Sequence, residues 1–216
     1  MTARVIVLLM APGFLLGLVL HELAHAASAN YFGDPTPKEK GRLTLNPLAH
    51  LAPIGSILVP ALLIFIGAPI IFGWARPVTV FRERMRHPRD LIWVAAAGPV
   101  TNLALAGLCA LLYRALSPFL PIAGPVTTKV MQMLMLACPI NLALGLINLL
   151  PIPPFDGGRI IEGLLVSKKA QRILKRVEAG GVFFIIGIFL LDPFSMTEHF
   201  FLFLGNASKS MLGVVL

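Results

Sequence analysis

Charged residues are scarce in this chain. Lys, Arg, Asp and Glu together make up 13% of its 216 residues, against about 25% in an average soluble domain. No polar stretch is long enough to form a soluble domain, and the sequence contains no internal repeat and no low-complexity tract. This composition excludes a disordered chain, a coiled coil and a collagen-like fibre.

Cysteine is equally rare. Only Cys109 and Cys138 occur, and both lie inside apolar stretches without CxxC spacing. The chain is therefore not a disulfide-rich secreted scaffold, and no redox role is indicated. We expect both residues to be buried structural thiols.

Apolar residues are abundant: they make up 57% of the chain, and the mean hydropathy is +0.85. A soluble domain of this size could not bury so much apolar surface, and the apolar runs are long enough for helices rather than barrel strands. The sequence therefore predicts an all-α polytopic membrane protein, a bundle of about four to six transmembrane helices. The runs cover 5–30, 53–72, 91–116, 130–150, 177–191 and 200–216.

Two of these runs are not expected to be simple spans. Prolines and a glycine break the run at 53–72, which favours a re-entrant or hairpin segment. Polar residues interrupt the run at 200–216, which is typical of a half-span or an interfacial helix. The breaking residues in the first case are Pro60, Gly67 and Pro69.

The formal net charge of +8 raises the question of a nucleic-acid partner. Of the 18 Lys and Arg residues, 14 fall in three short loops between apolar runs, at 33–52, 73–90 and 151–176. In such loops basic residues act as topology signals. We therefore expect no nucleic-acid partner.

One polar cluster lies inside the first apolar run. It reads His21-Glu22-Leu23-Ala24-His25, an H-E-x-x-H pattern. Residues four apart share a helix face, so both imidazoles can bind one metal ion, with Glu22 in reach of a water molecule on that ion. A charged residue near the bilayer centre costs about 2.5–3.5 kcal/mol. A divalent metal offsets that cost, whereas the alternative is polar packing without a metal.

A catalytic zinc usually has three protein ligands and one open position, so a third ligand must come from elsewhere. His50, His87 and His199 lie outside the runs or near their ends. Asp156 is the best candidate, because it follows the fourth run in the proline-rich stretch 148–158, NLLPIPPFDGG. Unwound backbone at membrane depth is tolerated only where it is buried in protein or lines a polar cavity. The alternative is an ordinary loop in which Asp156 is a helix N-cap.

Together, HELAH and NLLPIPPFDGG strongly resemble the site-2 protease family of intramembrane zinc metalloproteases. That family pairs H-E-x-x-H with a later N-x-x-P-x-P-x-x-D-G. Three further segments resemble its compact prokaryotic branch, namely NPLAH at 46–50, GWARPV at 73–78 and AGPVTN at 97–102. The last of these matches the family's G-P-x-x-N.

This resemblance implies an enzyme, a zinc metalloendopeptidase that hydrolyses peptide bonds within or near transmembrane segments of membrane proteins. It implies one zinc ion per chain and Glu22 as the general base. It also suggests that Asn148 and Asn102 contact the substrate or support the oxyanion. The implied partners are transmembrane protein substrates and the lipid bilayer. The implied zinc ligands are His21, His25 and Asp156.

Topology places a condition on this assignment. HELAH lies near the C-terminal end of the first run, and Asp156 follows the C-terminal end of the fourth, so a shared metal requires both ends on one side. The run at 53–72 must then cross the membrane an even number of times. The basic loops fall on that same side, and the positive-inside rule places it in the cytoplasm. We predict a multi-pass protein of the cell membrane whose active site opens toward the cytoplasm.

A transmembrane substrate must unwind before its peptide bonds can be attacked, because a helix pairs all its backbone groups. The stretches at 43–45 and 77–80 are candidate strand-like loops that offer an edge to an unwound substrate. The alternative is that both stretches are loops that dip into the headgroup region.

Two other functions fit a metal site in a membrane. A divalent-metal transporter often shows repeated halves, and none is visible here. An inactive relative that only binds substrates would not need Glu22. We expect one membrane-embedded metalloprotease domain over 1–216, with a core at 5–165 and accessory C-terminal helices at 177–216.

Overall fold

The computed structural model describes residues 3–66, 75–122, 124–165 and 195–213, and a few residues between 167 and 177. The described residues are mainly helical, and among them no β-strand forms, which confirms the predicted all-α class. The α-helices are α1 (Ala3–Tyr31), α2 (Thr36–Glu39), α3 (Pro47–His50), α4 (Val59–Phe65), α5 (Asp90–Leu116), α6 (Pro125–Asn148), α7 (Asp156–Leu164) and α9 (Met196–Leu212). A π-helix covers Pro53–Leu58, and 3-10 helices cover Arg82–Arg84 and Ser117–Ile122.

In the part of the chain that the structure describes, three helices are long and apolar enough to cross a membrane. These segments, Val5–Tyr31, Asp90–Leu120 and Pro125–Asn148, contain 27, 31 and 24 residues. At 1.5 Å per residue they extend about 36–46 Å, more than the hydrocarbon core of about 30 Å. They match the predicted runs at 5–30, 91–116 and 130–150, and the polytopic membrane fold is confirmed.

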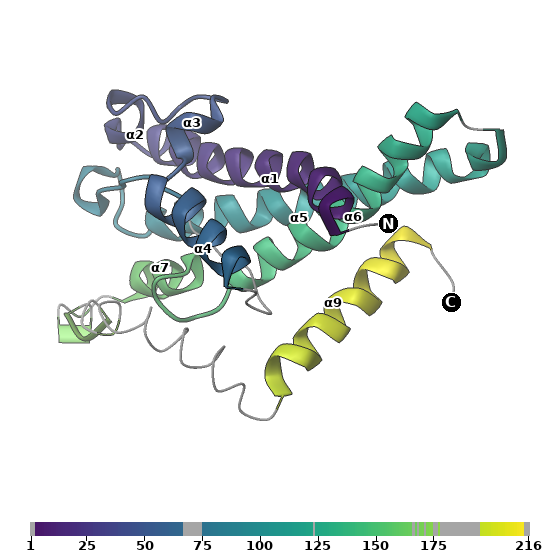
Figure 1. Ribbon diagram of the computed structural model, residues 1–216. Coiled ribbons are helices and arrows are strands. Elements are labelled where there is room, and N and C mark those ends of the chain that lie inside the picture. Colours follow the sequence, from purple (N-terminus) through teal and green to yellow (C-terminus); the bar gives the residue numbers. More distant parts are fainter. Residues whose placement is uncertain are drawn as a thin grey trace.

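Small residues let the long helices α1, α5 and α6 pack closely (Figure 1). A Cβ atom on Gly13 of α1 would lie 2.5 Å from the Cβ of Ala137 on α6. Ala26 and Ala106 are fully buried on α1 and α5. Lipid gives little hydrophobic drive for helix association, so such close backbone approach is a main source of stability.

Both ends of the segment between α1 and α5 lie at the same end of the bundle. Ala29, near the end of α1, packs against Leu91 and Val94 at the start of α5 and against Met85. In Figure 1, α2, α3 and α7 gather at this end. The chain thus leaves α1 and enters α5 at the same end of the bundle, which is the arrangement that the topology argument requires.

The described part of the run at 53–72 is short. Its helical residues, Pro53–Phe65, extend about 20 Å at 1.5 Å per residue. That length is less than the hydrocarbon core of about 30 Å. The remainder of the run, after residue 66, lies outside the described residues.

The two C-terminal runs have different outcomes. Apart from Val177, the run at 177–191 lies outside the described residues. The run at 200–216 corresponds to α9, which packs on α5 and α6 through Leu204 and Leu212. Phe201 and Phe203 of α9 remain exposed.

Neither of the two predicted strand-like loops forms a β-strand. The chain bends at 43–45, where the carbonyl of Thr44 accepts a hydrogen bond from His50 Nε2 at 2.9 Å. The residues at 76–81 form neither helix nor turn. Leu51 and Ala75 form an isolated antiparallel bridge at the start of this segment, and Phe81 at its end has an extended backbone. A strand edge at 43–45 is therefore wrong.

The shared end of α1 and α5 leads to a labelling prediction. With Cys109 and Cys138 replaced, single cysteines at Lys38 and Arg84 should react from the same side of the membrane, because both exposed residues lie at that end. A cysteine at Phe119, which is 57% exposed beyond the other end of α5, should react from the opposite side. Labelling of Lys38 and Arg84 from opposite sides would contradict the even number of crossings.

Candidate metal centre

His21, His25 and Asp156 meet in the interior of the bundle. The two histidines lie one turn apart on α1, and Asp156 is the first residue of α7. Their Nε2 atoms are 3.0 Å apart, and each lies 3.2 Å from Asp156 Oδ2. All three residues are at most 8% exposed. Tertiary contact has thus brought together residues more than 130 positions apart, and they are the three predicted from the sequence.

Hydrogen bonds on the outer nitrogens orient both imidazole rings. His25 Nδ1 lies 2.7 Å from the carbonyl oxygen of Val94, and His21 Nδ1 lies 2.6 Å from Asn102 Oδ1. A carbonyl oxygen only accepts, so each Nδ1 carries the proton and each Nε2 directs its lone pair inward. Two lone pairs and a carboxylate then face one another, and no donor among the described residues lies between them. A single proton can bridge only two of these three atoms in a hydrogen bond, whereas one divalent cation can coordinate all three.

The distances and donor types fit zinc. Zn–N and Zn–O bonds of about 2.0–2.2 Å give a tetrahedron with edges of about 3.3–3.6 Å. The observed separations of 3.0–3.2 Å are within a few tenths of an ångström of such edges. Two imidazoles and one carboxylate are also a known ligand set of catalytic zinc, which keeps its fourth position open.

Asp156 reaches the histidines because the helical path of α6 is broken. α6 ends at Asn148, and the prolines that follow cannot continue it. α7 then begins with Phe155 as its N-cap residue, so the alternative that Asp156 is an ordinary N-cap is wrong. A carboxylate in the first turn of a helix is stabilised by the helix dipole.

Glycines make this arrangement possible on two sides. A Cβ on Gly157 would overlap the carbonyls of Leu149 and Leu150, so the loop folds tightly over the first turn of α7. A Cβ on Gly98 of α5 would overlap His25 Nε2 and come within 2.7 Å of the His21 ring. Gly98 therefore forms the wall of the metal centre opposite α1.

Glu22 lies beside the histidines and is 8% exposed. Its Oε2 accepts a hydrogen bond of 3.0 Å from the backbone N–H of Val78, in the segment at 76–81 between the isolated bridge and the 3-10 helix at Arg82–Arg84. Arg42 is buried nearby and donates to the carbonyl of Ala49. Burial and the charge of Arg76 lower the pKa of Arg42, and the charge of Glu22 opposes this shift.

The two predicted asparagines lie in different places. Asn102 is fully buried beside His21, and both ends of its amide are hydrogen-bonded within the protein. Asn148 is half-buried at the end of α6 and donates to the carbonyl of Leu144 at 2.9 Å. Their predicted roles toward a substrate stay predictions.

Sequence reasoning missed Asn141 and the backbone groups of Val78 and Val94. Asn141 carried a usable signal, because a buried amide inside an apolar run requires a partner. The backbone groups carried none, since every residue type offers the same N–H and carbonyl.

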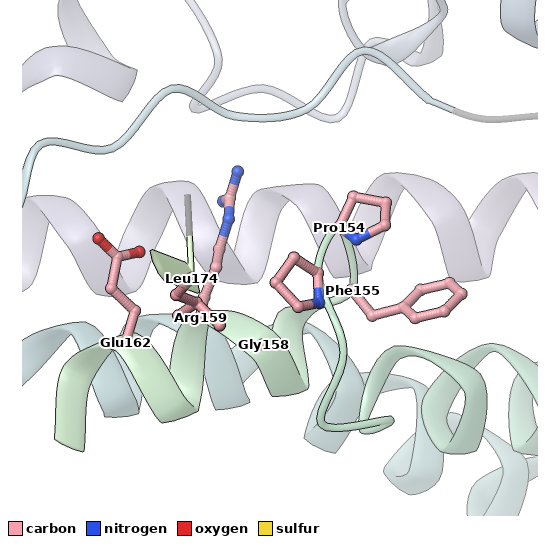
Figure 2. Close-up of a pocket in the computed structure, with 7 residues that line it drawn as sticks. Pro154, Phe155, Gly158, Arg159, Glu162 and Leu174 are labelled. Carbon is pink, nitrogen blue, oxygen red and sulfur yellow. The ribbon is translucent and has the colours of Figure 1, made fainter. Parts of the chain in front are cut away.

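A shallow pocket borders the loop before α7 (Figure 2). Figure 2 shows Arg159 and Glu162 pointing to the same side of α7, with Pro154 and Phe155 on the adjoining loop. The remaining lining residues are Pro153, Gly158 and Leu174.

Comparisons with known proteins agree on one family. Residues 118–191 match the sequence pattern of peptidase family M50. The Bacillus subtilis protein named "Putative zinc metalloprotease YwhC" is 38% identical over 174 residues, which are 80% of this chain and 76% of that protein. Two proteins named "Putative zinc metalloprotease Rip2" are also similar. The Mycolicibacterium smegmatis protein is 33% identical over a region that covers 93% of this chain and 76% of its own length. The Mycobacterium tuberculosis H37Rv protein is 36% identical over a region that covers 87% of this chain and 68% of its own length. No solved structure matches the chain significantly.

The contact of Gly98 with both rings leads to a matched pair of variants. Gly98→Ala should lower zinc affinity at least about tenfold, comparable to loss of a group that orients a ligand, because the added methyl displaces the imidazoles. Gly107→Ala on the same helix should keep full zinc affinity, since its methyl meets nothing within 4 Å. Zinc affinity of the detergent-solubilised protein, measured by chelator competition, checks both. Equal affinity in the two variants would contradict the assigned position of Gly98.

Proposed function

The chain belongs to peptidase family M50 and is a zinc metalloprotease, and from this premise we propose that it hydrolyses peptide bonds within or near transmembrane segments of membrane proteins. One observation carries the proposal. The predicted ligands His21, His25 and Asp156 converge on one point inside the bundle, and Glu22 lies next to them. We propose that these three residues hold one zinc ion per chain.

The depth of the centre supports cleavage inside the membrane. His21 lies ten residues before the end of α1 at Tyr31, about 15 Å along the helix axis. That distance is about half the thickness of a hydrocarbon core of 30 Å. The broken stretch between α6 and α7 lies at the same depth, because Asp156 touches both histidines. The centre is thus within the bilayer and nearest to the end where α2, α3 and α7 gather.

Zinc held by these residues would polarise the scissile carbonyl and acidify water. The protein's own contribution is proton transfer by Glu22. Its Oε2 is held by the N–H of Val78, so the carboxylate is oriented before substrate arrives. Glu22 takes a proton from the attacking water and passes it to the amine nitrogen as the carbon–nitrogen bond breaks. The water oxygen becomes part of the new carboxyl group.

The segment at 77–80 is proposed to hold the unwound substrate. Two buried carboxylates hold this segment in place: Glu22 accepts a hydrogen bond from the N–H of Val78, and Asp34 Oδ2 accepts one of 2.6 Å from the N–H of Phe81, the residue that follows. Thr79 is exposed between these two points. A segment fixed in this way offers backbone groups for pairing with an extended peptide. The substrates are then transmembrane proteins whose helices unwind locally beside this segment.

The location follows from the charged loops. The end of the bundle nearest the metal centre carries the basic loops at 33–52 and 73–90. By the positive-inside rule, that end lies on the cytoplasmic side of the cell membrane. The active site is proposed to open to the cytoplasm.

Glu22→Gln tests the proton-transfer role. The amide keeps the shape of the side chain but cannot take a proton, so turnover should fall by about 10²–10⁴-fold. Zinc should remain bound, since the ligands are unchanged. Cleavage of a model transmembrane substrate in liposomes and zinc per chain are the two measurements. Glu83→Gln, at an exposed position, is the matched control and should behave as the wild type. Near-normal turnover in Glu22→Gln would rule out this mechanism.

Asp156→Ala and His21→Ala test the ligand set. Both should lower zinc stoichiometry together with turnover, because each removes one of three ligands. His199→Ala, on an exposed histidine of α9, is the control for loss of an imidazole. Full zinc and full cleavage in Asp156→Ala would exclude Asp156 as the third ligand, and the buried His50 would be the next candidate.

A further inference from the structure

Two asparagines are buried where α1, α5 and α6 meet. Asn102 on α5 is fully buried, and Asn141 on α6 is 2% exposed. Burying an amide costs several kcal/mol unless its donors and acceptor are paired. In this protein the amides pair with one another and with His21, so their hydrogen bonds form a chain that ends at the metal centre.

The chain begins at backbone carbonyls. Asn141 Nδ2 donates to the carbonyl of Ala137 at 3.0 Å and to that of Gly13 at 3.3 Å. Carbonyl oxygens only accept, so the NH₂ group of Asn141 must face them. The Oδ1 atom of Asn141 is therefore turned the other way, toward α5.

The same reasoning orients the next amide. Asn141 Oδ1 requires a donor, and Asn102 Nδ2 supplies it at 3.0 Å while also donating to the carbonyl of Gly17 at 3.2 Å. Asn102 Oδ1 is then the atom that faces His21, at 2.6 Å from Nδ1. An amide oxygen only accepts, so the proton of the His21 ring is on Nδ1 and Nε2 is free to bind a metal.

Glycines on α1 make room for this chain. Gly13, Gly17, His21 and His25 follow one another at intervals of four residues and share one face of the helix. A Cβ on Gly17 would overlap Asn141 Oδ1 and lie 3.2 Å from Asn102 Nδ2. The groove left by the two glycines is thus filled by the two amides, directly beside the histidine that they orient.

We infer that Asn102 and Asn141 are positioning residues: Asn102 Oδ1 fixes the metal-binding tautomer of His21, and Asn141, together with the Gly17 carbonyl, orients the Asn102 amide so that this oxygen faces the histidine. This inference rests on the proposed role of His21 as a zinc ligand. His25 needs no such relay, because its Nδ1 meets the carbonyl of Val94 directly. The tautomers of the two proposed ligands on α1 are therefore fixed in different ways. A single backbone carbonyl fixes His25, and two side chains in series fix His21.

Two substitutions of Asn102 distinguish a role in orienting His21 from a purely structural role in holding the helices together. Asn102→Leu removes the acceptor for His21 and should weaken zinc binding by about 10–100-fold, the usual effect of losing a group that orients a ligand. Asn102→Asp keeps an oxygen for His21 Nδ1 but loses the donor to Gly17 and Asn141, and its zinc affinity should stay within a few-fold of wild type. If Asn102 only held the helices together, both variants would lose zinc affinity equally, because both lose the hydrogen bonds that Nδ2 donates to Gly17 and Asn141.

The measurement is zinc affinity of the full-length protein in detergent, by competition with a chelator of known affinity. Asn206→Leu, at an exposed asparagine of α9, is the matched control and should bind zinc as the wild type does. A melting curve of each zinc-free variant checks folding, and if Asn102→Leu does not fold, Asn102→Asp decides alone. Weak zinc binding by a folded Asn102→Asp, in a protein whose wild type cleaves its substrate, would overturn the inference and leave the proposed function intact. Preserved zinc affinity in Asn102→Asp, with loss in Asn102→Leu, would support it even if no substrate were cleaved.

Discussion

Three acceptor atoms meet inside an apolar bundle, and the rest of the structure is arranged around that convergence. The Nε2 atoms of His21 and His25 and the Oδ2 atom of Asp156 lie 3.0–3.2 Å apart, buried from water. Without a shared cation these atoms repel one another, and in a membrane no solvent is at hand to separate them. A divalent metal held by these three residues would make the arrangement favourable, and the proposed function depends on it.

The break between α6 and α7 follows from this requirement. A continuous helix would carry the chain past the histidines with its backbone fully paired. Prolines after Asn148 end the helix at the depth of the site, and Asp156 starts the next helix with its carboxylate in the favourable first turn. Arg82 donates to the carbonyls of Glu162 and Leu165 at the other end of α7, which secures the helix that carries the ligand.

Several buried polar groups around the site are paired with backbone groups. Glu22 and Asp34 each accept from a backbone N–H of the segment at 76–81. Asn102 and Asn141 pair with carbonyls of α1 and α6 and with His21. These contacts join α1, α5, α6 and this segment, which suits a site whose proposed ligands must be in place before a substrate unwinds beside them.

The sequence alone predicted the membrane class, the runs that form the three long apolar helices of the described residues, and the three residues that meet inside the bundle. Hydropathy and the four-residue spacing of His21 and His25 are local properties, so they carry over to the structure. The bend at 43–45 accompanies a hydrogen bond from His50 to Thr44, a tertiary contact that residue type does not announce. The contacts of Gly98, the N–H of Val78 and the relay through Asn141 were likewise set only by tertiary structure. Each is a pairing between backbone or side-chain groups distant in the chain, and the geometry of helix packing, rather than residue type, chooses the partner.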